Sequence, residues 1–191
     1  MENMRNFGMA VNVHDSAMKR LPPAGEGPNG ERHPMSWRVH VLPYLEEDSL
    51  YKKIRTAGEN NEMPQWDDPA VADLVKNMPL IYRNPSQHWP DNQTNYLVVT
   101  GPGTIYDPEN FPRGVGMSDL SRGDGMSNTV WLVEADADQV VPWQAPEDWE
   151  FDTNDPRRGL GNLRPGGFMV LFADGHTQFI SHKIDPDVLR G

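Results

Sequence analysis

The sequence contains no cysteine. Disulfide scaffolds, thiolate zinc sites and cysteine nucleophiles are therefore excluded. Long apolar runs are missing too, because the longest, residues 168–173, falls far short of the roughly 20 residues that a membrane-spanning helix needs. Basic side chains are scarce: 17 Lys and Arg stand against 28 Asp and Glu, a net charge of -11. Since nucleic acids are bound through Lys and Arg, we expect no nucleic-acid partner.

Catalytic signatures are absent as well. The histidines form no metalloprotease pair with a glutamate, and neither a Gly-Xaa-Ser-Xaa-Gly elbow nor a phosphate-binding glycine loop occurs. We therefore expect a protein that is not an enzyme and that holds no organic cofactor.

The first half of the chain has helical character. A helix is predicted over residues 2–19, where the side chains that share one face are Met4, Phe7, Val11, His14 and Met18. No cap residue precedes this stripe, so we expect the natural chain to continue upstream with a membrane anchor that is absent here. Three shorter helices are expected: one that begins after Ser36, one with Pro43 in its first turn and Lys52, Lys53 and Arg55 at its end, and one from Asp68-Pro69 to about Lys76.

The second half has strand character. Runs of β-branched and aromatic residues at 96–99, 129–133 and 168–173 are separated by Gly, Pro, Asp and Asn. Asp174-Gly175 joins the last run to residues 177–180 and predicts a hairpin with a type I′ turn, in which both turn residues have positive φ. Helices followed by antiparallel strands predict a single α+β domain over residues 1–191 with long loops.

An acidic stretch is the one place where the sequence supports a metal ion. Residues 134–155 carry eight carboxylates and no Lys or Arg. On a strand, three alternating carboxylates would share one face, and Ca²⁺ accepts such oxygen ligands. The predicted calcium ligands are Glu134, Asp136, Asp138, Asp152 and Asp155. A solvated acidic loop without an ion is the alternative interpretation.

Six tryptophans are many for this length. In a chain with few other large apolar groups they favour core packing, although an exposed row of them would stack on sugar rings. Trp143 and Trp149 separate the two interpretations, because a binding platform needs them in water.

Several motifs occur in a specific order along the chain. They are Asn3 to Ala10 with His14-Asp15 and Leu21-Pro22-Pro23; Ser36-Trp37-Arg38-Val39; Leu42-Pro43-Tyr44-Leu45-Glu46; Asn95-Tyr96; Asp124-Gly125 with Asn128-Thr129; Pro165-Gly166-Gly167-Phe168; and Asp174-Gly175-His176. In this order they resemble the bacterial prepilin-like proteins of domain-of-unknown-function family 1559.

The resemblance implies a type IV pilin-like or type II secretion pseudopilin-like architecture. In such proteins a cleaved and methylated N-terminal segment leads into a long helix, whose first half anchors in the membrane and whose second half packs on an antiparallel sheet. It implies structural roles for Phe7, Asp124, Gly125, Asn128, Asp174 and Gly175. The expected location is outside the cytoplasmic membrane, in the periplasm or at the cell surface, with pilin-like subunits or envelope proteins as partners.

Two positions depart from the family pattern. Asn84 stands where the family often has a cysteine, so a family disulfide is lost. Arg164 stands where a histidine precedes the Gly-Gly of the last block. No metal or hydrogen-bond role is therefore transferred from that histidine.

Two functions follow as hypotheses. The first is a non-enzymatic pilin-like subunit that acts by packing with other subunits in an extracytoplasmic assembly. The alternative is an extracellular module that binds a sugar or peptide through exposed tryptophans and an acidic loop with calcium.

Overall fold

The computed structural model describes residues 2–27, 29–86, 88–111, 114–122 and 125–190. Its first half holds short helices after one long one: α1 Glu2–Met18, α2 Trp37–His40, η1 Leu42–Tyr44, α3 Asp48–Ala57, η2 Glu59–Asn61, η3 Pro69–Val71, α4 Ala72–Val75 and η4 Leu80–Tyr82. The remainder holds β1 Gln93–Thr94, β2 Tyr96–Thr100, α5 Met117–Leu120, β3 Val130–Glu134, η5 Ala137–Gln139, β4 Val141–Pro142, β5 Trp149–Glu150, β6 Gly167–Phe172, β7 Thr177–Ser181 and α6 Pro186–Arg190. The predicted α+β class is confirmed.

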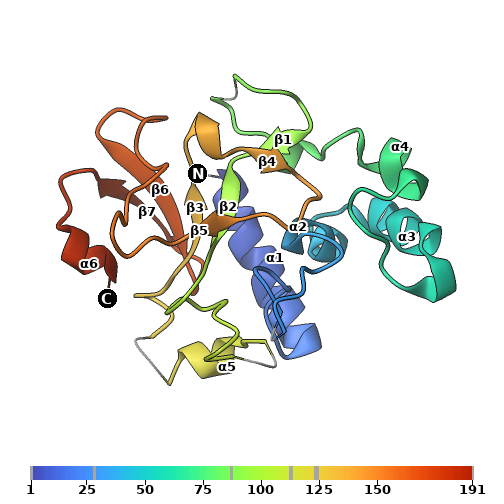
Figure 1. Ribbon diagram of the computed structural model, residues 1–191, viewed down its shortest axis with the longest axis horizontal. Coiled ribbons are helices and arrows are strands. Elements are labelled where there is room, and N and C mark those ends of the chain that lie inside the picture. Colours follow the sequence, from blue (N-terminus) through green and yellow to red (C-terminus); the bar gives the residue numbers. More distant parts are fainter. Residues whose placement is uncertain (1, 28, 87, 112–113, 123–124, 191) are drawn as a thin grey trace.

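The described strands form a five-stranded sheet in the order β5-β2-β3-β6-β7 and a small pair, β1-β4. Every neighbouring pair is antiparallel except β5 and β2, which run parallel over two residues. In Figure 1 the sheet lies on one side of α1 and the short helices α2, α3 and α4 lie on the other. Helix α1 is therefore the central element of the molecule.

The inner face of α1 carries the predicted stripe. Met4, Phe7, Val11 and His14 are buried as expected. Met18 is 56% exposed, so its predicted burial is wrong. The reason is local, because α1 ends at Met18 and the chain turns at Lys19, whose φ is 60°. The stripe has no core left to contact at that point.

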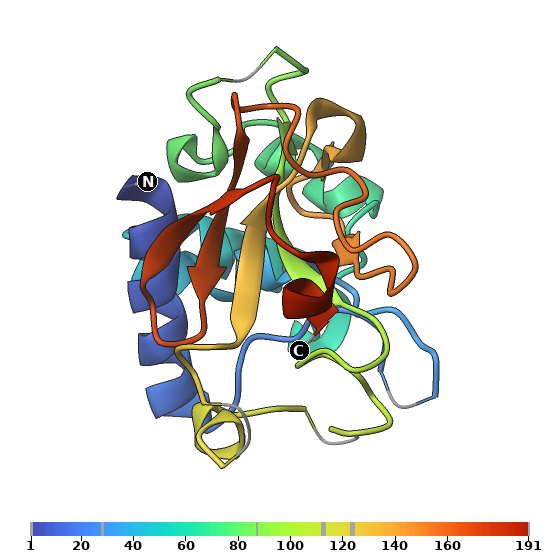
Figure 2. The same ribbon diagram turned by 90° about the vertical axis from the view of Figure 1, so that its left-hand side faces the viewer.

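A close approach of backbones joins α1 to the sheet. A Cβ atom added to Gly8 would lie 3.0 Å from the Cα atom of Gly175, a tighter contact than nine in ten Cβ atoms make in proteins. Figure 2 shows α1 running alongside the β6–β7 hairpin. Glycine at position 8 lets the helix contact the hairpin turn directly, while Gly175 is favoured by its positive φ.

The central strands β2, β3 and β6 are buried on both faces, whereas the edge strand β7 is mostly exposed. Along β2, Tyr96 and Val98 face the cluster that contains α1, whereas Leu97 and Val99 belong to a second cluster with Trp149. This alternation follows from the two-residue period of a strand. It explains why the sequences of the central strands are nearly continuously apolar.

The hairpin between β6 and β7 is confirmed, but its predicted type I′ turn is wrong. The Gly175 amide donates to the Phe172 carbonyl, and the Phe172 amide donates to the His176 carbonyl, so three residues form the loop. Gly175 has a positive φ of 91°, whereas the φ of Asp174 is not positive. This is a three-residue loop that ends in a left-handed glycine, the next most common hairpin connection.

Both helix caps that the sequence predicts in the first half are observed, but the predicted position of Pro43 is wrong. Ser36 caps α2 by accepting a hydrogen bond from the Arg38 amide, and Asp68 caps η3 by accepting one from the Ala70 amide. Pro43 lies in η1 and not in the first turn of the longer helix, since α3 begins only at Asp48. Within the described part of the chain, no helix is both long and apolar enough to cross a membrane.

Candidate functional site

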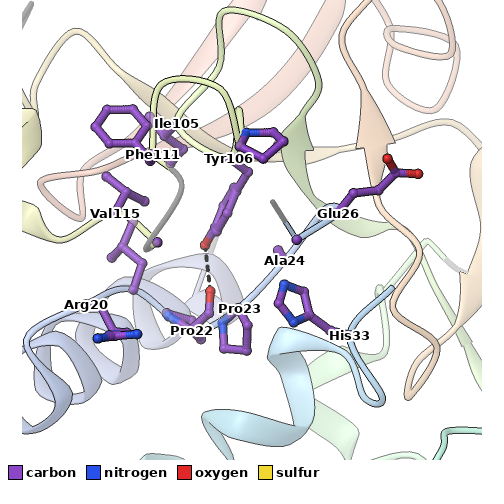
Figure 3. Close-up of a pocket in the computed structure, with 14 residues that line it drawn as sticks. Arg20, Pro22, Pro23, Ala24, Glu26, His33, Ile105, Tyr106, Phe111 and Val115 are labelled. Carbon is purple, nitrogen blue, oxygen red and sulfur yellow. Dashed lines mark hydrogen bonds between the residues drawn. The ribbon is translucent and has the colours of Figure 1, made fainter. Parts of the chain in front are cut away.

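An apolar pocket of about 380 Å³ opens where the chain leaves α1. We call it the Pro22 pocket. Two regions that are distant in sequence form its walls (Figure 3). The first comprises residues 20–27 with His33, and the second comprises residues 105–111 with Gly114 and Val115. Its apolar lining consists mainly of Leu21, Pro22, Pro23, Ala24, Ile105, Tyr106, Phe111 and Val115.

Tyr106 holds the two walls together. Its hydroxyl donates to the Pro22 carbonyl at 3.1 Å, the bond drawn in Figure 3, and accepts from Trp131 Nε1 at 2.9 Å. Burial raises the pKa of Tyr106. The hydroxyl is therefore a structural group with both of its hydrogen-bonding roles occupied, and it is unsuited to proton transfer.

The polar groups of the Pro22 pocket lie at its rim and do not converge. Figure 3 places Arg20 at one end, and His33 and Glu26 at the other. Burial lowers the pKa of His33, against the opposing charge of Glu31. Among the described residues, Arg20 is thus separated from the other two titratable side chains by the apolar lining.

A second, more polar pocket of about 280 Å³ lies beside α4. We call it the Trp66 pocket. Four segments contribute its lining, which consists of Trp66, Asp67, Asp68, Ala72, Val75, Lys76, Asn92 and Gln144.

A buried ion pair between Arg38 and Asp148 lies in the core. Arg38 Nη2 contacts Asp148 Oδ1 at 2.9 Å, and both side chains are almost fully buried. The same oxygen accepts from the Trp37 indole and the Val98 amide, while Asp148 Oδ2 has no partner among the described residues. Burial raises the pKa of Asp148, and the Arg38 guanidinium limits that rise.

The role of this pair is to connect α2 to the sheet. Arg38 Nε and Nη2 donate to the Tyr96 carbonyl at 3.1 and 2.8 Å, so the guanidinium bridges β2 and the loop that carries Asp148. Sequence reasoning missed the pair. The available signal was a single arginine inside the apolar Trp37-Arg38-Val39 motif, and nothing pointed to Asp148 as its partner.

The two departures from the family pattern meet at one carboxylate, that of Glu134. Asn84 Nδ2 donates to Glu134 Oε1 at 2.7 Å, and Arg164 pairs with both carboxylate oxygens. The hydrogen bond from Arg164 to Glu134 raises the pKa of Arg164. Glu134 is 2% exposed, so its charge is neutralised inside the protein by a partner distant in sequence.

The predicted calcium ligands are not brought together. Strand β3 ends at Glu134, so the expectation that Asp136 and Asp138 share its strand face is wrong. The Ala135 amide still donates to the carbonyl of Asn95, the residue before β2, but the Asp136 amide donates to the Gly159 carbonyl. The chain therefore leaves the sheet before η5 begins.

Each remaining predicted ligand has its own surroundings. The Asp136 carboxylate accepts bonds from the Asn162 amide, the Asn162 side chain and the Leu163 amide at 2.7–2.9 Å. Asp138 and Asp155 are exposed, and Asp152 pairs with Arg158 at 3.1 Å. Among the described residues, no three His, Asp or Glu side chains form a group suited to a metal ion.

The structure gives the surroundings of five of the six residues with predicted structural roles, and the roles themselves stay predictions. Phe7 is fully buried and stacks on Tyr82 with ring centres 5.3 Å apart. Gly125 has a φ of 86°, and the Asn128 amide donates to its carbonyl at 3.1 Å. Asp174 Oδ1 accepts from the His176 amide at 3.0 Å. Asp124 lies outside the described residues.

Trp143 and Trp149 are 0% and 4% exposed. Each donates its indole proton to a backbone carbonyl, of Val75 and of Arg158 respectively. The core interpretation is therefore correct for both, and neither forms a platform for a ligand.

Comparison with known families gave one match. The model of the family described as "Protein of unknown function (DUF1559)" matches residues 1–155. This range includes α1 and strands β1 to β5 and stops before β6. Comparison with curated proteins found no match. Comparison with solved structures also found none.

Proposed function

The chain belongs to the family described as "Protein of unknown function (DUF1559)", and we propose that it is a non-enzymatic pilin-like or pseudopilin-like subunit of an extracytoplasmic secretion or surface assembly. The observation that carries this proposal is the packing of α1. One face of this helix is buried against an antiparallel sheet, as the resemblance to prepilin-like proteins implies.

The opposite face of α1 supplies the surface for a neighbouring subunit. Met9 and Val13 are 61% and 52% exposed although both are apolar. They lie four residues apart, so they are neighbours on the helix surface. An adjacent exposed pair of apolar side chains on the central helix suits packing against another subunit.

The chemistry of the pockets agrees with a non-enzymatic role. The charged groups of the Pro22 pocket lie apart at its rim, and the Tyr106 hydroxyl is occupied by hydrogen bonds. The proposed partners are further pilin-like subunits or envelope proteins. A membrane anchor ahead of residue 1 is part of the same proposal.

The alternative of a sugar-binding module built on Trp143 and Trp149 loses its basis, because both are buried. The predicted calcium ion is likewise not carried into the proposal, since the carboxylates named for it lie apart.

Cysteine cross-linking tests the subunit proposal directly. The chain has no cysteine, so each introduced thiol is the only one that these residues contribute. We would express the complete gene in its native host with Met9→Cys or Val13→Cys, attach benzophenone maleimide to the introduced thiol in cell envelopes, and irradiate, so that the benzophenone inserts into a C–H bond of the neighbouring protein. Both variants should give a cross-linked species that contains this chain.

The matched control is Lys183→Cys, which places a thiol at an exposed site outside α1. It should give no specific product. Equal cross-linking in all three variants, or none in any, would contradict the proposed subunit contact.

A further inference from the structure

The Trp66 pocket combines a partly exposed aromatic ring with polar groups from several segments. Trp66 packs one side against the core and is held by its backbone amide, which donates to the Pro34 carbonyl at 2.8 Å. Its volume of about 280 Å³ is at the lower end of small-molecule sites, which are roughly 300–1,000 Å³. The pocket is thus of a size for one small ring.

Gln144 gives the pocket an unused hydrogen-bond acceptor. The residue is 8% exposed, and its side-chain oxygen Oε1 is buried without a partner among the described residues. Its backbone carbonyl accepts from the Ser36 amide at 3.0 Å, which fixes the residue in place. A buried acceptor without a donor destabilises the folded protein, so a ligand hydroxyl that reaches this oxygen when the Gln144 side chain rotates toward the pocket would satisfy an existing deficit.

The charged groups around the pocket have both signs. Asp68 Oδ1 accepts from the Ala70 amide at 2.8 Å, which leaves the rest of its carboxylate for a ligand. Lys76 is exposed and forms no ion pair with any described residue. Two carboxylates, from Asp67 and Asp68, disfavour a phosphate. Neutral hydroxyl groups, which both donate and accept, match this mixture.

Trp143 connects two of the segments that line the pocket. Its backbone amide donates to the Asn92 carbonyl at 3.1 Å, and its indole donates to the Val75 carbonyl at 2.8 Å. Two walls that are distant in sequence are therefore fixed to one fully buried ring. A preformed site loses less conformational entropy on binding than one that must be assembled by its ligand.

We propose that the Trp66 pocket binds a single sugar ring, with the ring face against Trp66 and a hydroxyl donating to Gln144 Oε1. Asp67, Asp68, Lys76 and Asn92 also line the pocket and supply donors and acceptors for the remaining hydroxyls. The binding site differs from the α1 surface of the proposed function and does not depend on it.

The test is a titration of the ¹⁵N-labelled chain with glucose, galactose and N-acetylglucosamine, followed through the tryptophan indole signals. At least one sugar should shift the Trp66 signal saturably at concentrations up to about 50 mM, a range that detects millimolar dissociation constants. Trp66→Ala should weaken binding about tenfold, measured on the backbone amides of the pocket.

A Gln144→Met variant gives a second readout with the opposite sign. It keeps the length of the side chain but removes the unpaired acceptor, so binding should weaken about three- to tenfold while the melting temperature stays the same or rises. Trp89→Phe, a change at a partly exposed tryptophan outside the pocket, is the control and should bind like the wild type.

The absence of a saturable shift with all three sugars would overturn the proposal. So would unchanged binding in both Trp66→Ala and Gln144→Met. Neither result bears on cross-linking through α1, so the two proposals can fail separately.

Discussion

At the scale of single residues, His40 links folding to pH. Its Nε2 atom is buried without a partner among the described residues, and burial, together with the charges of His14 and His33, lowers its pKa from 6.5 to about 4. As the pH falls, the unfolded chain binds the proton first. The stability from neutral His40 is therefore complete above pH 6.5 and is lost as the pH falls toward 4.

We expect this loss to be about 3 kcal/mol in the free energy of unfolding. Urea unfolding at neutral pH and near the lowered pKa measures the total loss in the wild type and in His40→Leu. The part that comes from His40 should disappear in the variant, whereas the part from His14 and His33, whose pKa values burial also lowers, should remain. His182→Gln, at an exposed histidine, should behave like the wild type. An unchanged pH dependence in His40→Leu would show that another group is responsible.

Glu134 is a second residue with a testable energetic role. Arg164→Leu removes the guanidinium and leaves a buried carboxylate whose described partner is then Asn84. Because Arg164 is 34% exposed and water can enter, we expect a loss of about 2 kcal/mol, less than for a fully buried pair. Combining it with Glu134→Gln should restore part of this stability in denaturant titrations. An Arg164→Leu variant as stable as the wild type would show that the Glu134–Arg164 pair does not stabilise the fold.

At the scale of elements, α1 holds the two sides of the molecule together through Phe7. This ring contacts Trp37, Tyr82 and Tyr96 with centroid distances of 5.3–5.8 Å. Phe7→Asp places an unpaired charge in the core, so we expect loss of cooperative thermal unfolding. Met9→Asp, on the exposed face of the same helix, is the matched control and should melt within a few degrees of wild type. Similar melting temperatures for the two variants would contradict the observed orientation of α1.

Elements with a local signal were predictable from the sequence, and those that depend on distant partners were not. Helix α1 and strands β2, β3, β6 and β7 have apolar patterns of their own. Strand β5 has two residues, and its parallel pairing with β2 depends on contacts such as the bond from Thr100 Oγ1 to the Trp149 carbonyl. The turn at Asp174-Gly175 was misassigned because an Asp-Gly pair suits both a two-residue and a three-residue loop.

At the scale of the whole molecule, the candidate sites arise from contacts between distant segments. The Trp66 pocket unites residues 66–76 with Asn92 and Gln144, and the Pro22 pocket unites residues 20–27 and His33 with residues 105–111, Gly114 and Val115. No local pattern indicates such neighbours, so these sites were not predictable from the sequence. The acidic stretch illustrates the converse, because residues close in sequence diverge once β3 ends at Glu134.

We propose that this chain is part of a prepilin-like subunit whose helix α1 joins an assembly, and mass spectrometry of the native gene product, purified from the cell envelope, is the sharpest test. The expected mature protein has a methylated N-terminal residue followed by an apolar segment that leads into α1. An unmodified product recovered from the cytoplasm, or one without an apolar segment ahead of α1, would rule out the proposed subunit.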